Sequence, residues 1–319
     1  MSVKIVDANL RKAPWINTAT WINDGSVSNA SEVLEAAKLD WEVQHTELST
    51  VAINNEGAQI LTLADKVCTT RVNKDGTASV LGITSPTYSI VQNGDIVDMV
   101  DAVTYESGAI YESAGELRGG KKIFLAAKLP HNLALTDQMI DPVNAFLIVS
   151  NTHDGTDSLR FEIKYLRQIC TNGMKGWVRS SSIAFRHSAR MKVSAENVRS
   201  ALGVIMESVS EFNDLSLKLV NEKLSNADFY NVVQSMLPIT DDMTERQKSV
   251  VTTRREALME IYSGPTQENI KGTAWGMINA FTEYEQWAHT NRSTHQDVAE
   301  RFMLGYGNDL SSALLEARV

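Results

Sequence analysis

The sequence predicts an α+β fold: a central helix and antiparallel β-hairpins that form a sheet, followed by a largely helical C-terminal region. Three observations predict this class. β-prone runs flank tight turns, an amphipathic segment precedes two of these hairpins, and helical periodicity dominates the last third of the chain. We therefore expect an α+β domain with an antiparallel sheet over residues 1–190 and a helical region over residues 191–319.

The N-terminal elements are a short helix, a strand and a hairpin. Asn29 or Ser31 can cap the helix, because apolar residues follow on one helical face. Residues 40–54 alternate as a strand does and end at two asparagines. Residues 66–83 contain two β-prone runs around an Asp-Gly turn, which predicts a hairpin.

The centre of the chain predicts one helix and two further hairpins. Residues 94–108 form an amphipathic helix that Gly108 can end. Residues 109–130 form a hairpin that turns at a Gly-Gly pair. A second hairpin pairs residues 143–151 with residues 158–169 across an Asp-Gly turn.

The last third of the chain has a helical pattern with caps at several starts. A serine opens the first segment, and Pro265 and Glu268 suit the start of a later one. Helices are expected at 194–224, 226–236, 243–262, 267–289 and 294–316. We find no repeat of fixed period.

Charge is distributed unevenly along a chain whose formal net charge is −9. Residues 1–150 and 200–319 each carry a net charge of −7, and residues 151–199 carry +5. The overall acidity argues against indiscriminate binding along duplex DNA, but a local groove for phosphates remains compatible with it. No apolar stretch approaches the length of a membrane span, so we expect no membrane partner.

Motifs of the common enzyme classes are absent from the sequence. It contains no GxxxxGK[ST], no GxGxxG that opens a helix, no HExxH and no GxSxG. The run from Gly119 to Lys122 is expected to be a turn rather than a phosphate loop. We therefore name no catalytic residue, expect neither a cofactor nor a metal site, and favour a non-enzymatic role.

The best catalytic candidate is the group of His153, Asp154 and Asp157. A histidine beside carboxylates can bind a metal or act as a base. The alternative is structural, because an Asp-Gly pair between two strands is typical of a tight turn. The two cysteines, Cys68 and Cys170, are isolated, which fits a reducing compartment and does not suggest a zinc site.

A basic segment interleaved with aromatic residues is the most suggestive feature of the sequence. In residues 158–169, alternation places Leu159, Phe161, Ile163 and Tyr165 on one face and the charged residues on the other. Grooves for single strands combine cations with aromatic faces. The candidates for contact with nucleic acid are Lys121, Lys122, Arg160, Lys164, Arg167, Lys175, Arg179, Arg186 and Arg190, with Tyr165 and Trp177 as stacking residues. The same charges can instead pair within the chain or with another subunit.

Aromatic residues also recur with helical spacing near the C-terminus. They are Trp275, Phe281, Tyr284 and Trp287. Such spacing is typical of packing in a core or between helices. Stacking on bases is the alternative.

Three stretches carry a resemblance to a known family. They are 41-WEVQHTEL-48, 150-SNTHDGTDSLRFEIKYLRQICTNGM-174 and 272-GTAWGMINAFTEYEQWAH-289. The chain resembles the phage/plasmid-like family known as domain of unknown function 932. The resemblance implies a protein of a bacteriophage, plasmid or integrated element, made in the cytoplasm of a bacterial host. The order of elements is also similar to the core of phage single-strand annealing proteins, which form rings or filaments.

These observations lead to three hypotheses of different kinds. The first is a homo-oligomeric protein, a ring or a filament, that binds single-stranded DNA without catalysis in recombination or strand annealing. The second is an interaction protein that inhibits a host defence or nuclease complex, with acidic flanks that imitate nucleic acid. The third is a metal-dependent nuclease that uses His153, Asp154 and Asp157.

Overall fold

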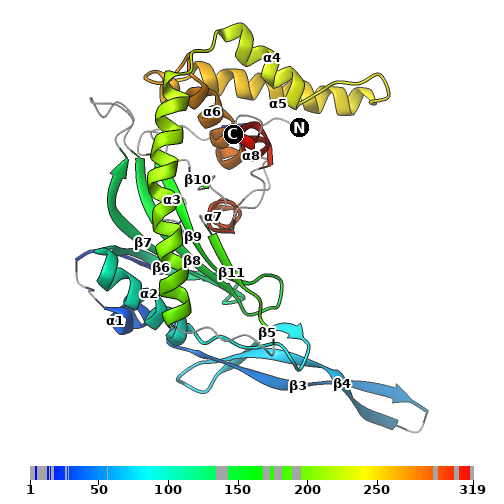
Figure 1. The fold of residues 1–319 in the computed structure, drawn as a ribbon. Helices are drawn as coiled ribbons and strands as arrows, with labels where there is room; N and C mark the ends of the chain where they lie inside the picture. The colour runs from blue at the N-terminus through cyan, green and yellow to red at the C-terminus, as the bar shows by residue number, and fades with distance from the viewer. Residues whose placement is uncertain are drawn as a thin grey trace.

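The computed structural model describes residues 4–5, 13, 15, 18–25, 27, 29–55, 57–133, 143–167, 173–175, 182–188, 195–289, 294–304 and 309–316. A central sheet forms the body of the molecule, and a long helix crosses it (Figure 1). A narrow β-ribbon projects from one end of this body, and a group of helices lies at the other end. The α+β class expected from the sequence is confirmed.

A seven-stranded antiparallel sheet forms the body. Its strands are β2 (Trp21–Ile22), β6 (Ile110–Leu117), β7 (Lys122–Leu133), β8 (Val143–Thr152), β9 (Leu159–Arg167), β10 (Gly173–Lys175) and β11 (Ser182–Phe185). The order is β10-β9-β8-β7-β6-β2, and β11 pairs with another part of β9. Both expected hairpins of the centre, β6–β7 and β8–β9, are confirmed. Short strands lie along both edges of the sheet, which reduces the backbone open to a further strand.

One face of the sheet packs against α2 (Asn93–Ser107) and the long helix α3 (Ala195–Asn221). Phe161, Ile163 and Tyr165 of β9 are fully buried on this face. The ring of Tyr165 stacks on Phe212 of α3, and the ring centroids are 3.6 Å apart. The face of β9 predicted to be apolar is therefore the face that the helices cover.

The opposite face of the sheet has its own apolar cluster. Phe146 of β8 meets Trp15 with ring centroids 5.1 Å apart, and Trp15 in turn meets Phe302 of α7 (His295–Leu304) at 5.1 Å. Leu166 of β9 belongs to the same cluster. The sheet is therefore covered on both faces, and its charged residues near α7 do not face open solvent.

Local signals set the ends of α1 (Ala30–Ala36) and α2. The side chain of Asn29 accepts a hydrogen bond from the Glu32 N–H at 3.1 Å, so Asn29 is the cap. Gly108 ends α2 with φ +68°, in the left-handed region that favours glycine. Both helices begin close to the residues expected from the sequence, and α2 also ends where expected.

A second, three-stranded sheet consists of β3 (Glu42–Asn54), β4 (Gly57–Val72) and β5 (Ala78–Thr84). β3 and β4 pair along their whole lengths, whereas β5 pairs only with residues 67–72 of β4. The outer part of the β3–β4 hairpin is therefore a two-stranded ribbon, which projects from the body (Figure 1). The β4–β5 hairpin was expected, but the pairing of β4 with β3 was not.

The base of this ribbon is fixed to the body by directional contacts. The Gln92 side chain donates to the Val43 carbonyl at 2.7 Å and accepts from the Val43 N–H at 2.9 Å. Arg71 lies 4.5 Å from the Trp41 ring centroid and donates to Glu116 of β6 at 2.6 Å. Gln92 thus satisfies both backbone groups of a strand residue, as a neighbouring strand would.

The C-terminal helices surround one buried helix. They are α4 (Asn226–Met236), α5 (Glu245–Ser263), α6 (Ala274–Trp287) and α8 (Asp309–Glu316), with a short 3₁₀ turn, η2 (Pro265–Gln267). Every residue of α6 is buried. A short pair, β1 (Lys4–Ile5) with β12 (Ala288–His289), follows α6.

Two of the expected C-terminal helices differ from the structure. The segment expected at 267–289 begins at a new cap, Thr273, because η2 precedes it. The segment expected at 294–316 is two helices, α7 and α8. One cluster of buried side chains includes residues from both sides of position 190, among them Tyr165 and Phe212. Within the described residues, no helix is both long and apolar enough to cross a membrane.

Candidate nucleic-acid interface

Three aromatic rings lie together where the β-ribbon joins the body, and we call this group the stack although only Tyr88 and His187 are parallel, while His45 is tilted by 58° against Tyr88. His45 comes from β3, Tyr88 follows β5, and His187 follows β11. The ring centroids of Tyr88 and His187 are 4.6 Å apart with an interplanar angle of 21°, and those of His45 and Tyr88 are 6.4 Å apart. His45 is exposed, so the outer end of this stack faces solvent.

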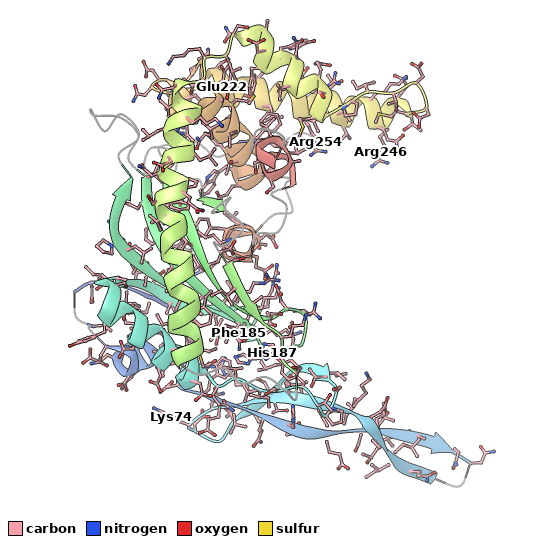
Figure 2. The ribbon with its side chains drawn as sticks, viewed as in Figure 1. Lys74, Phe185, His187, Glu222, Arg246 and Arg254 are labelled. Carbon is pink, nitrogen blue, oxygen red and sulfur yellow. The ribbon has the colours of Figure 1, made fainter. Side chains whose placement is uncertain are left out.

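Hydrogen bonds to the backbone hold Tyr88 and His187 in place. A turn brings the Tyr88 N–H to the Ser85 carbonyl at 3.0 Å, and the Tyr88 hydroxyl donates to the Thr152 carbonyl at 2.6 Å. Nδ1 of His187 donates to the Ser89 carbonyl at 2.8 Å. Figure 2 shows Phe185 and His187 beside the base of the ribbon.

Both anchored rings of the stack are neutral near pH 7. Burial raises the pKa of Tyr88 far above its ordinary value, and the charge of Asp154 raises it further. Burial lowers the pKa of His187, although its hydrogen bond to the Ser89 carbonyl acts in the opposite direction. The rings of Tyr88 and His187 are therefore uncharged, which suits stacking more than ion pairing.

Two of the predicted cations are exposed around this region. Alternation along β11 directs Ile183 and Phe185 toward the core and leaves Arg186, one residue before His187, exposed. Lys121 is exposed in the β6–β7 turn, and its carbonyl accepts from the His153 N–H at 2.8 Å. The turns that carry Lys121 and His153 therefore lie side by side.

Two more predicted cations are partly buried and paired with acids. Arg160 donates to Asp157 at 2.8 Å, and its side chain is 37% exposed. Lys122 lies 4.0 Å from Glu300 of α7. These contacts match the alternative considered for the sequence, in which the charges pair within the chain.

Three of the predicted contact residues lie in the interior. Lys164 is 1% exposed and pairs with Glu162 at 3.0 Å beneath α7. Tyr165 is buried against Phe212, and Arg167 is buried with its guanidinium donating to the Thr266 carbonyl at 2.8 Å. A nucleic acid cannot reach them in this fold, because α3 and α7 cover the two faces of β9.

The remaining predicted residues cannot be placed around the stack. Lys175 belongs to β10, but its side chain lies outside the described residues. Trp177, Arg179 and Arg190 also lie outside them, as does Cys170. Much of the basic segment therefore stays a prediction from the sequence.

His153 belongs to a buried network that joins three parts of the fold. Its Nε2 lies 2.9 Å from Asn93 Oδ1, and the Asn93 amide donates to the Leu39 carbonyl at 2.8 Å. Oδ1 of Asn93 is therefore an acceptor, and Nε2 of His153 carries the proton. The ring also meets Trp41 edge-on, with centroids 5.3 Å apart. Burial lowers the His153 pKa to about 3, which disfavours a role as a base near neutral pH.

The two aspartates after His153 have structural partners. Oδ1 of Asp154 accepts from the Thr156 N–H at 3.1 Å, and Gly155 has φ +77°, so the Asp-Gly pair forms the expected turn. Asp157 accepts from the Ser158 N–H at 2.8 Å besides pairing with Arg160. Among the residues that the structure describes, no three His, Cys, Asp or Glu side chains gather as a metal site would require.

The C-terminal aromatic residues pack in the core, as their spacing predicts. Trp275 is fully buried and meets Phe212 of α3, with ring centroids 6.1 Å apart. Glu283 of α6 accepts from Thr266 Oγ1 at 2.8 Å and from Gln267 Nε2 at 3.0 Å. The polar residues of α6 therefore hold η2, whose Thr266 carbonyl also binds Arg167 of the sheet.

The stack itself is the part of the site that sequence reasoning missed. His45, Tyr88 and His187 come from three segments separated by about 40 to 100 residues, and no local motif links them. The one available signal was the position of His187 inside the basic segment. Their proximity depends on how β3, β5 and β11 meet, which a periodic pattern does not encode.

The fold and the site define a class: an α+β protein with an antiparallel sheet, a long covering helix, a projecting ribbon and an aromatic stack with exposed cations. The family model of the domain of unknown function DUF932 matches residues 80–303, and the chain belongs to this family. The matched range includes Tyr88 and His187, whereas the ribbon precedes it. No curated protein and no solved structure matches the chain.

Proposed function

We propose that this chain is a protein of a bacteriophage, plasmid or integrated element that binds single-stranded nucleic acid without catalysis. In this proposal it acts in the cytoplasm of a bacterial host as a homo-oligomer in recombination or strand annealing. The observation that carries the proposal is the stack of His45, Tyr88 and His187, with Arg186 exposed beside it. Surfaces for single strands combine such rings with cations that follow the backbone.

The roles of the named residues follow from their positions. A base would stack on the exposed ring of His45, which lies beside the more buried Tyr88. Arg186, and Lys121 from the neighbouring turn, would neutralise phosphates. The net charge of −9 repels phosphates away from these two cations, so the attraction is local. We expect weaker binding to a duplex, because its bases are not available for stacking.

Fluorescence anisotropy with a labelled single-stranded oligonucleotide and its duplex tests this function. We expect micromolar or tighter binding to the single strand. We also expect affinity to fall steeply between about 50 and 200 mM salt, because phosphate contacts release counterions. Absence of binding to both forms would overturn the proposal and favour the interaction protein described above.

Two variants and a matched control test the site. His45→Ala removes the exposed ring, and Arg186→Ala removes the adjacent charge. Each should weaken binding by about tenfold, since stacking contributes about 1–3 kcal/mol per base and a lost phosphate contact also lowers the salt dependence. Arg246→Ala removes an exposed arginine of α5 at the far end of the molecule (Figure 2) and should leave affinity unchanged. If all three variants bind with the affinity of the wild type, the binding surface lies elsewhere.

A further inference from the structure

The outer end of the β-ribbon is an exposed surface without charge in its strands. We define the arm tip as residues 48–64. Among its described residues, all except Leu48 and Ala52 are exposed, and none carries a charge. Ile53 is 83% exposed and Ile60 is 73% exposed. An apolar surface of this kind in a folded protein usually marks an interaction site.

Both faces and both edges of the arm tip are available for contact. The register pairs Val51 with Ile60 and Thr50 with Leu61, so that aliphatic side chains lie on each face. The pairing of β4 with β5 ends at Val67, which leaves the backbone edges of the tip without a further strand among the described residues. A two-stranded ribbon is marginally stable by itself in water, so a partner that covers it would also stabilise it.

The composition of the arm tip indicates a protein as its partner. Residues 48–64 contain no lysine or arginine, so the tip offers phosphates no counter-charge. They also contain no tryptophan, tyrosine or phenylalanine, and a lipid surface typically selects such rings together with basic residues. Aliphatic side chains with uncharged polar ones between them are compatible with a protein groove.

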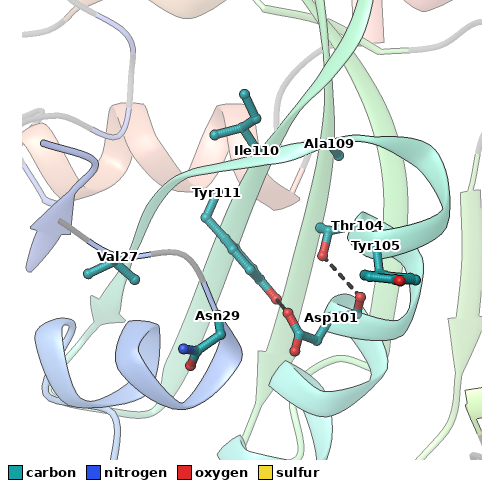
Figure 3. Close-up of a pocket in the computed structure, with 8 residues that line it drawn as sticks. All are labelled: Val27, Asn29, Asp101, Thr104, Tyr105, Ala109, Ile110 and Tyr111. Carbon is teal, nitrogen blue, oxygen red and sulfur yellow. Dashed lines mark hydrogen bonds between the residues drawn. The ribbon is translucent and has the colours of Figure 1, made fainter. Parts of the chain in front are cut away.

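The same chain carries a groove of this character on another side. A hollow of about 400 Å³ lies between the start of α1, the end of α2 and the start of β6 (Figure 3). Its rim includes Tyr105, which is 92% exposed, and Ile110, which is 63% exposed. We call it the α2–β6 groove.

The floor of the α2–β6 groove is already ordered by hydrogen bonds. The Tyr111 hydroxyl donates to Asp101 at 3.2 Å, and Thr104 Oγ1 donates to the Asp101 carbonyl at 3.1 Å (Figure 3). The one carboxylate in the lining thus has a partner of its own, and the rim beside it is apolar. The uncharged strand residues of the ribbon can pack against this groove without leaving an unpaired ion.

We propose that the arm tip of one copy of this chain packs aliphatic side chains into the α2–β6 groove of a second copy. The arm projects away from α1 and α2, so one copy does not fill its own groove in this conformation (Figure 1). Two different surfaces that meet head to tail leave one of each free on every pair of copies, so association continues into a ring or a filament. The inference rests on the proposed function only in expecting self-association. It adds the two surfaces through which the copies associate.

The 17 residues of the arm tip supply most of the residues that a specific contact needs. Stable interfaces involve about 20–30 residues on each side. The tip contributes two strands whose faces and edges are all accessible, and the adjoining shoulder of the ribbon can add to them. A strand rises about 3.3 Å per residue, so the ten residue steps from Val67 to Gly57 carry the ribbon about 33 Å past the last pair with β5.

Sedimentation velocity without nucleic acid, on the full chain and three variants, tests the proposal. Ile60→Lys places a charge on the arm tip, and Ile110→Lys places one on the groove rim. Each should weaken self-association by about tenfold or more, because the charge would be buried at the contact. Tyr230→Lys changes an exposed aromatic residue of α4 and is the matched control, with no effect expected. All three side chains are exposed, so circular dichroism and melting should show folded proteins.

A mixture of the two defective variants distinguishes head-to-tail contact from other arrangements. The Ile60→Lys chain keeps an intact groove, and the Ile110→Lys chain keeps an intact arm. Mixed together, they should form a one-to-one dimer that grows no further. A wild type that stays monomeric, an Ile110→Lys chain that assembles normally, or a mixture that stays monomeric would each overturn the proposal. Because no nucleic acid is present, none of these results bears on strand binding.

Discussion

His153 is the residue at which the ribbon, helix α2 and the central sheet meet. It contacts Trp41 before β3, Asn93 at the start of α2, and Asn151 at the end of β8. The Asn93 contact requires a proton on Nε2, while Nδ1 faces the amide of Asn151 at 3.5 Å. A charged imidazole would direct a second N–H at that amide, so the network fits only the neutral ring.

We expect this network to make stability depend on pH. Burial lowers the folded-state pKa of His153 to about 3, from an ordinary value of 6.5. Above pH 6.5 the imidazole is neutral in both the folded and the unfolded chain, so burying it carries no charge penalty. As pH falls from 6.5 toward the folded-state pKa, only the unfolded chain takes up the proton, and the folded state loses stability. The free energy of unfolding should therefore decrease by roughly 2 kcal/mol between pH 7 and pH 5 from this residue.

Urea unfolding at pH 5, 6 and 7 measures this dependence. His187 also has a lowered pKa and contributes in the same direction, so the comparison needs a variant that removes one histidine only. His153→Phe should lower stability at pH 7, because Asn93 loses a partner, yet show a shallower decline toward pH 5. If the free energy of unfolding falls equally steeply with pH in His153→Phe and in the wild type, His153 does not cause the pH dependence.

At the scale of elements, β5 and the β8–β9 turn approach unusually closely. A Cβ added to Gly82 would lie 2.6 Å from the Asp154 Cα and 2.9 Å from its carbonyl oxygen. Only glycine allows this approach, because backbone atoms cannot yield as a flexible side chain can. The three-stranded sheet thus contacts the body through Gly82 as well as through Gln92.

Gly82→Ala should destabilise the protein, and a second glycine serves as its control. We expect a loss of about 1–3 kcal/mol in the free energy of unfolding, since the methyl group would separate β5 from the turn. Gly203 lies in α3 with open space around its Cβ position, and Gly203→Ala should stabilise the chain by up to about 1 kcal/mol. Thermal unfolding of the two variants provides the comparison, and equal melting temperatures would contradict the close approach.

Elements whose signals are local could be predicted from the sequence. The cap at Asn29, the stop at Gly108 and the Asp-Gly turn before Asp157 each depend on a few neighbouring residues, and each is confirmed. The strand at β3 was predicted, but its pairing with β4 was missed because residues 57–65 do not pack on a core, so no hydrophobic alternation identifies them as a strand.

The candidate site was harder to predict from the sequence than the fold was. Alternation correctly separated the two faces of β9, but it could not show that α7, more than 120 residues later, covers the charged face. Lys164 therefore lies inside beneath α7, and Arg167 lies inside against η2, although their residue types suggested a surface. Burial of a charge depends on packing between distant elements, which one sequence does not reveal.

At the scale of the whole molecule, the two proposed interactions should respond to salt in opposite ways. Strand binding through Arg186 should weaken as salt rises, because counterions compete for phosphates. Self-association through the apolar strands of the arm tip should not weaken, and it should strengthen slightly, because salt screens the repulsion between copies that each carry −9. Sedimentation at about 50 and 500 mM sodium chloride measures the second effect. Dissociation at high salt would indicate an ionic interface.

The pairing of Gln92 with Val43 has a geometrical consequence for any assembly of this chain. Two hydrogen bonds and the Trp41–His153 contact fix the direction in which the ribbon leaves the body. In a head-to-tail series, that direction recurs at every joint, so a small angular change is multiplied by the number of copies. The side-chain amide of Gln92, at the N-cap of α2, would then help to determine the curvature and pitch of the assembly. It would thereby decide whether the assembly closes on itself.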